Sequence, residues 1–72
     1  MGGIIEDKIF EVLVGDKLTT HEIKGRLEGI SYGREYGTIN HHLRKMVSSK
    51  QLDRHKITDG EYVYWNPCMV SE

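Results

Sequence analysis

The sequence predicts a small α+β domain in which three helices precede a two-stranded β-hairpin. Two observations predict this order. Apolar residues recur at helical spacing in three successive segments before residue 50, and an Asp-Gly pair separates two strand-like runs after it. The 72 residues contain no internal repeat, low-complexity tract or linker, so we expect one domain over residues 1–72.

The first helix is predicted at about residues 3–14. The apolar residues Ile5, Ile9, Val12 and Leu13 follow helical spacing, which places them on one face of a helix. Gly15 follows the last turn, in the position where a glycine commonly ends a helix.

The second helix is predicted at about residues 19–29. Thr19 and Glu22 have the spacing of a capping box, in which each side chain accepts a hydrogen bond from the other residue's backbone N–H. Gly25 lies in the middle of this helix, where glycine costs about 1 kcal/mol relative to alanine. We therefore expect a neighbouring helix to pack closely at Gly25, and Gly29 to end the helix.

The third helix is predicted at about residues 36–49, and most of it lies in the segment TINHHLRKMVSSKQL, residues 38–52. Ile39, Leu43 and Met46 form its apolar stripe. Polar and cationic side chains that can contact a base edge or a phosphate occupy the rest of its surface, namely Asn40, His41, Arg44 and Lys45.

The C-terminal hairpin is predicted over residues 51–65, with Asp59-Gly60 in its turn and residues 66–72 as a tail. Its aromatic residues Tyr62, Tyr64 and Trp65 are interpreted as core residues in preference to base-stacking residues. Alternation along the strands should bury one set of side chains and expose the other.

The charge distribution indicates a binding surface. The formal net charge is −1, yet residues 34–56 carry six bases against two acids. An ordinary solvated face would have the same composition, so charge alone leaves both interpretations open. These bases are concentrated in the segment predicted to form the third helix and the hairpin, and this favours a surface that binds a polyanion.

Several classes of protein are not indicated by the sequence. Cys68 is the single cysteine, so an intrachain disulfide or a zinc site built on paired cysteines is excluded. The adjacent His41 and His42 would point about 100 degrees apart on a helix and could not chelate one ion. No catalytic constellation, cofactor site or small-molecule site can be assembled, and we do not expect an enzyme. No apolar run approaches the roughly 20 residues of a membrane span, so a cytoplasmic protein is expected.

Three segments, LTTHEIKGRLEG, TINHHLRKMVSSKQL and HKITDGEYVYW, resemble the winged helix-turn-helix DNA-binding domain. The resemblance extends from about Ile4 to Trp65. It implies a three-helix winged helix-turn-helix fold with a C-terminal two-stranded β-hairpin wing. It also implies that the third helix enters the major groove and that the hairpin tip lies beside the phosphate backbone or the minor groove.

The resemblance implies a specific set of DNA-contacting residues. Thr38, which caps the third helix unless that helix begins nearer Arg34, would contact a phosphate. Arg44 has the strongest claim to a base contact, because arginine paired with guanine is the commonest specific contact. The full set is Tyr36, Thr38, Asn40, His41, Arg44, Lys45, Arg54, Lys56 and Thr58.

A narrower resemblance, to the members of this superfamily that bind Z-form nucleic acid, rests on the spacing of Asn40, Leu43 and Met46. Tyr36 and Arg44 stand where those members have a lysine and a tyrosine, and the proline pair of their wing is absent. The narrower assignment is therefore not adopted.

The expected function is sequence-specific binding of double-stranded DNA, in a transcriptional regulator. The alternative is a winged-helix protein–protein interaction module within a larger nucleic-acid-processing assembly, which the near-neutral net charge keeps open. A homodimer is left open as well, through the first helix or the tail. DNA binding should weaken steeply with salt, whereas apolar protein docking should not.

Overall fold

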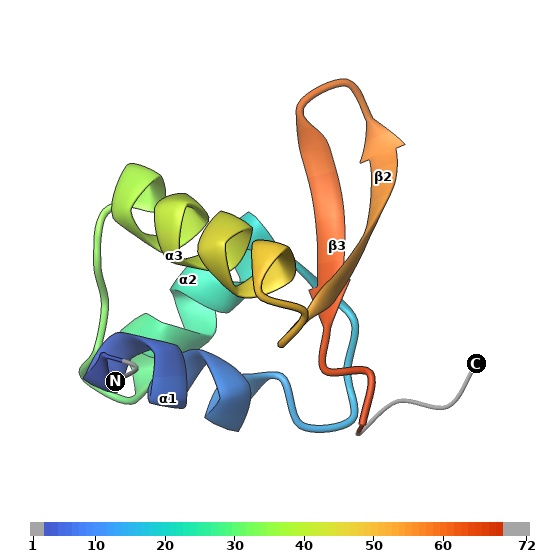
Figure 1. Cartoon of the computed structure of the whole chain (residues 1–72). Helices are drawn as coiled ribbons and strands as arrows, with labels where there is room; N and C mark the ends of the chain where they lie inside the picture. The colour runs from blue at the N-terminus through green and yellow to red at the C-terminus, as the bar shows by residue number, and fades with distance from the viewer. Residues whose placement is uncertain (1–2, 69–72) are drawn as a thin grey trace.

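All three predicted helices are present in the computed structural model, which describes residues 3–68 (Figure 1). Helix α1 spans Ile4–Val12, α2 spans Thr20–Gly29 and α3 spans Tyr36–Ser48. The prediction for the first helix extended two residues too far. Its C-cap is Leu13, and the chain turns at once into Gly15, whose φ of +74° is incompatible with helix continuation.

The strands form one antiparallel sheet in the order β1-β3-β2. Strand β1 spans Leu18–Thr19, β2 spans Asp53–Thr58 and β3 spans Glu61–Trp65. The hairpin was predicted, but β1 was not, because two residues are too few to carry a periodic pattern. Pairing of β1 with β3 makes β3 the central strand and joins the hairpin to the segment that precedes α2.

The predicted capping box at the start of α2 is confirmed. The Glu22 backbone N–H donates to the Thr19 hydroxyl oxygen at 3.3 Å, and the Thr19 backbone N–H donates to the Glu22 carboxylate at 2.9 Å. Two otherwise unpaired N–H groups are thereby satisfied at the point where β1 passes into α2.

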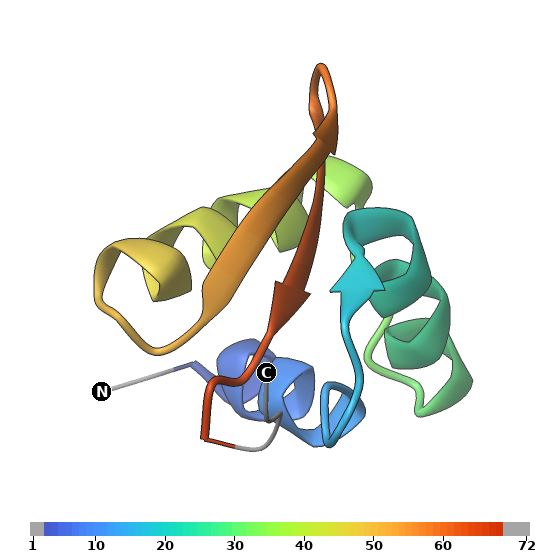
Figure 2. The same cartoon turned by 90° about the vertical axis from the view of Figure 1, so that its right-hand side faces the viewer.

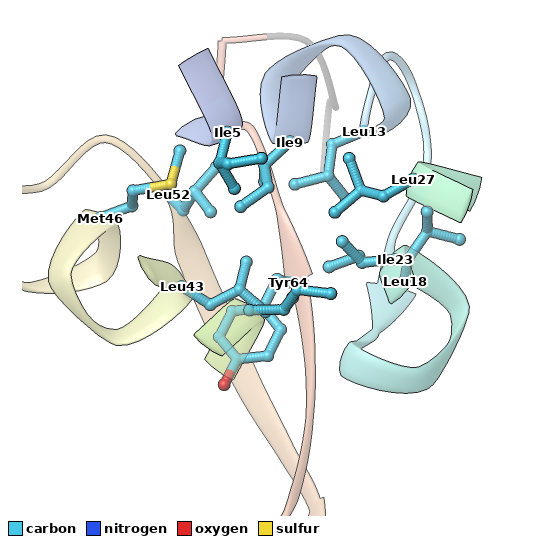
Figure 3. Packing of buried hydrophobic residues seen from close by; sticks show 11 residues of the cluster. Ile5, Ile9, Leu13, Leu18, Ile23, Leu27, Leu43, Met46, Leu52 and Tyr64 are labelled. Carbon is cyan, nitrogen blue, oxygen red and sulfur yellow. The ribbon is translucent and has the colours of Figure 1, made fainter. Parts of the chain in front are cut away.

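The apolar stripes of the three helices meet in one core, which β3 closes from one side (Figure 3). Tyr64 is the aromatic member of this core, and its hydroxyl oxygen points away from the centre of the cluster. Packing against these residues holds α3 in place. The buried set is Ile5, Ile9, Leu13, Leu18, Ile23, Leu27, Ile39, Leu43, Met46, Leu52 and Tyr64.

Close packing at a glycine occurs in the chain, but not at the predicted position. Gly25 is exposed, and a Cβ at this position would meet nothing within 4 Å, so the expected helix contact at Gly25 is wrong. The close approach is at Gly33 in the loop before α3, where a Cβ would lie 2.6 Å from Cγ of Glu28. Because glycine has no Cβ, the loop at Gly33 can pack directly against Glu28 of α2.

The hairpin of β2 and β3 projects past the helices (Figures 1 and 2). Alternation buries Tyr64 on β3 as expected, whereas every residue of β2 is exposed, contrary to the expectation for both strands. The reason is that β2 is an edge strand whose outer half has no helix beneath it. Of the predicted tail, residues 69–72 lie outside the described part of the chain.

Candidate nucleic-acid interface

Helix α3 has one buried face and one accessible face. Its buried residues are those of the predicted apolar stripe. On the other side Tyr36, Thr38, His41, Arg44 and Lys45 are exposed, and Asn40 is half-buried. The accessible positions expected of Asn40, His41, Arg44 and Lys45 on this helix agree with these exposures.

The adjacent histidines His41 and His42 differ in exposure. His41 is exposed, while His42 lies at the edge of the core with its Nδ1 3.1 Å from a carboxylate oxygen of Glu6. This contact joins α3 to α1 on the side away from the accessible face. Among residues 3–68, no group of three His, Cys, Asp or Glu side chains is placed to hold a metal ion.

The register of the hairpin places Arg54 and Lys56 on the side of the sheet that faces α3. Arg54 is paired with Tyr64 and Lys56 with Tyr62. Paired residues in an antiparallel ladder project to the same face, and Tyr64 is buried in the core on the helical side. The guanidinium carbon of Arg54 lies 4.2 Å from the centroid of the Tyr62 ring, a cation–π contact.

Two adjacent depressions lie between α3 and the hairpin, and Arg44 and Arg54 line both. We refer to these depressions together as the α3–hairpin groove. Neither lining includes an aspartate or a glutamate. One is lined by His41, Arg44, Lys45, Val47, Ser48 and Arg54, and the other by Asn40, Arg44, Arg54, Gly60, Tyr62 and Tyr64.

Three of the six Lys and Arg side chains that form no ion pair within residues 3–68 line the groove, and the other three are Lys17, Arg34 and Lys50. Within residues 3–68, no ion pair includes Arg44, Lys45 or Arg54. On the rest of the surface Lys8, Lys24 and Arg26 pair with carboxylates at 2.6–3.0 Å. The groove therefore concentrates uncompensated positive charge, although the whole chain has a formal charge of −1.

Four of the nine residues expected to contact DNA lie outside the groove, and one of the four, Lys56, is also paired with a carboxylate. Tyr36 and Thr38 are in the first turn of α3 and, like Thr58 on the hairpin, line neither depression. Lys56 forms an ion pair with Asp59 at 3.1 Å near the hairpin tip. The groove thus unites Asn40, His41, Arg44, Lys45 and Arg54 from the predicted set.

Two residues outside the predicted set, Tyr62 and His21, contact members of that set. Tyr62, expected to belong to the core, is only partly buried, and its ring contacts the guanidinium group of Arg54. The His21 ring, at the start of α2, lies 4.7 Å from the Tyr36 ring, so the two helix starts meet there. Neither contact had a local sequence signal, because each joins segments separated by a turn or a loop.

Comparison of the chain with models of protein families, with curated proteins and with solved structures gave no match. Among the described helices none has both the length and the apolar character needed to cross a bilayer. The chain is accordingly described by what its own residues establish, a three-helix α+β domain with a three-stranded antiparallel sheet and a carboxylate-free basic groove.

Proposed function

We propose that this chain is a winged helix-turn-helix domain that binds double-stranded DNA through α3 and the hairpin. The observation that carries the proposal is the α3–hairpin groove, where Arg44, Lys45 and Arg54 have no carboxylate partner among the described residues. Unpaired cations on one face attract a polyanion even when the whole chain is slightly acidic.

The dimensions of α3 suit a major groove. Its 13 residues extend about 20 Å at 1.5 Å per residue. A helix with its side chains is about 10–12 Å wide, which the roughly 12 Å major groove admits. Asn40 and His41 lie on the accessible side and bear groups that can hydrogen-bond to base edges. The projecting hairpin would then lie against the neighbouring backbone.

We also propose that the domain regulates transcription, which requires that it prefer one DNA sequence over others. Duplexes bound at low salt would first be selected from a random pool. Enrichment of a common motif is the expected result, and binding without enrichment would restrict the function to non-specific DNA binding.

A charge-matched pair of variants tests the surface. Arg44→Gln removes one cation from the groove, and Lys8→Gln removes one from α1, on the far side of the molecule from the hairpin tip (Figure 1). Fluorescence anisotropy with the selected duplex should give a loss of about 1–3 kcal/mol for Arg44→Gln. The affinity of Lys8→Gln should stay close to that of the wild type, and thermal melting would verify that both variants are folded.

Salt dependence separates this function from protein docking. The logarithm of the DNA association constant should fall linearly with the logarithm of salt concentration. Equal losses in the two variants, or no duplex binding at low salt, would contradict the proposal. In that case a partner captured with little salt dependence would favour the protein-interaction module.

A further inference from the structure

Arg44 and Arg54 converge on one location from two different elements. Arg44 is on α3 and Arg54 is on β2, ten residues further along the chain, yet both line each of the two depressions of the α3–hairpin groove. A base-reading arginine needs to project away from the protein into the DNA groove. Arg44 instead lines the same two depressions as Arg54, where one ligand could contact both side chains.

The Arg54 side chain is supported before any ligand binds. Its guanidinium group lies on the face of the Tyr62 ring at 4.2 Å. Tyr62 is itself packed against the hydrophobic core, which fixes the ring. Because this contact restricts the arginine rotamers in the free protein, less conformational entropy is lost when Arg54 binds an anion.

The composition of the groove specifies an anion with several oxygens. Two guanidinium groups repel each other, and no carboxylate lines either depression to separate their charges. A guanidinium group presents a planar set of donors that matches phosphate geometry. Lys45 and Ser48 line the same depression and provide further donors.

We propose that Arg44 and Arg54 bind the same backbone phosphate of the duplex, and that Tyr62 is the positioning residue for Arg54. This inference rests on the proposed DNA-binding function and refines it. It moves Arg44 from the base contact expected from the sequence to a phosphate contact. Sequence recognition is then left to Asn40 and His41. The shared phosphate joins the hairpin and α3 to a single point on the DNA backbone.

A double-mutant cycle with salt titrations tests whether the phosphate is shared. Arg44→Gln, Arg54→Gln and the double variant would be measured against the selected duplex and against single-base variants of it. If one phosphate is shared, the arginine that remains in either single variant still neutralises it, so the magnitude of the salt slope should fall by about 0.9 only in the double variant. The two single affinity losses should not multiply in the double variant, because both side chains contact one group.

Two separate phosphates would give a different result, and so would a base contact. With separate phosphates the slope would fall by about 1.8 in the double variant and the two losses would multiply. If Arg44 reads a base, its loss would relax preference at one position, whereas a phosphate contact weakens binding uniformly across sequences. Any of these outcomes overturns the shared site while leaving DNA binding intact.

Two substitutions of Tyr62 test the positioning role. Tyr62→Phe keeps the ring and should bind DNA within about twofold of the wild type. Tyr62→Leu removes the cation–π surface and should weaken binding by several fold. The leucine variant should have no further effect in the Arg54→Gln background. An equal effect in both backgrounds would show that Tyr62 acts through general stability and would overturn its positioning role.

A titration with inorganic phosphate tests the anion site without DNA. In the wild type, the side-chain Nε–H resonances of Arg44 and Arg54 should shift together with one dissociation constant. The response of Arg44 should be lost or much reduced in Arg54→Gln. If the exposed Arg34 responds equally, the effect is general ionic screening and the site is overturned. If the arginines respond but no duplex binds, the anion site stands and the DNA-binding proposal fails.

Discussion

Replacement of two glycines by alanine should change the free energy of unfolding in opposite directions. Gly25 lies within α2, is exposed, and has open space where a Cβ would be placed. Alanine in a helix interior is favoured over glycine by about 0.5–1 kcal/mol, because less backbone entropy is lost on folding. Gly25→Ala should therefore stabilise the domain by about that amount.

At Gly33 the same substitution meets the neighbouring helix. The new Cβ would lie 2.6 Å from Cγ and 3.3 Å from Cα of Glu28. The Glu28 side chain is held by an ion pair with Lys24, and its Cα cannot move without moving α2. Overpacking of this kind costs about 1–3 kcal/mol. That is a large part of the roughly 4–11 kcal/mol expected for a domain of 72 residues.

Urea unfolding followed by circular dichroism, with Trp65 fluorescence as the second probe, would measure both variants. For a domain of this size each 1 kcal/mol corresponds to a change in Tm of about 4–8 °C. The urea concentration at the midpoint of unfolding should rise for Gly25→Ala and fall for Gly33→Ala. The dependence of the unfolding free energy on urea concentration should stay unchanged in both variants. A shift of both midpoints in the same direction would refute the reasoning, because backbone entropy and steric overlap predict opposite signs.

Three further substitutions test other parts of the fold. Thr19→Ala removes the capping box and should lower the free energy of unfolding by about 0.5–2 kcal/mol in the same assay, whereas Thr19→Ser should retain most of that stability. Leu43→Ala opens a cavity under α3 and should cost about 2–5 kcal/mol, and a loss below 1 kcal/mol would mean that the helix is not packed as described. Gly60→Ala places a side chain at a φ of +79° and should cost about 1 kcal/mol or more, and an unchanged Tm would argue against this turn.

Sequence reasoning predicted the helices, the hairpin and the orientation of α3 because these features have local causes. The stripe of Ile39, Leu43 and Met46 requires one face of the helix to be buried, which leaves Arg44 and Lys45 accessible. The capping box likewise needs residues only three positions apart. These elements would be expected in any fold that provides a core for them.

Tertiary structure alone decided which side of the hairpin carries the cations. Continued from the pairing of Thr58 with Glu61, an unbroken ladder would place His55, not Arg54, opposite the buried Tyr64. The irregularity between Lys56 and Thr58 shifts the register by one residue, and the strand period of two then turns Arg54 toward α3. The sequence determined that this chain has a basic helix followed by a hairpin that carries Arg54 and Lys56. The bulge and the pairing of β1 with β3 determined that the two meet in one groove, because register and long-range pairing depend on contacts that no local pattern encodes.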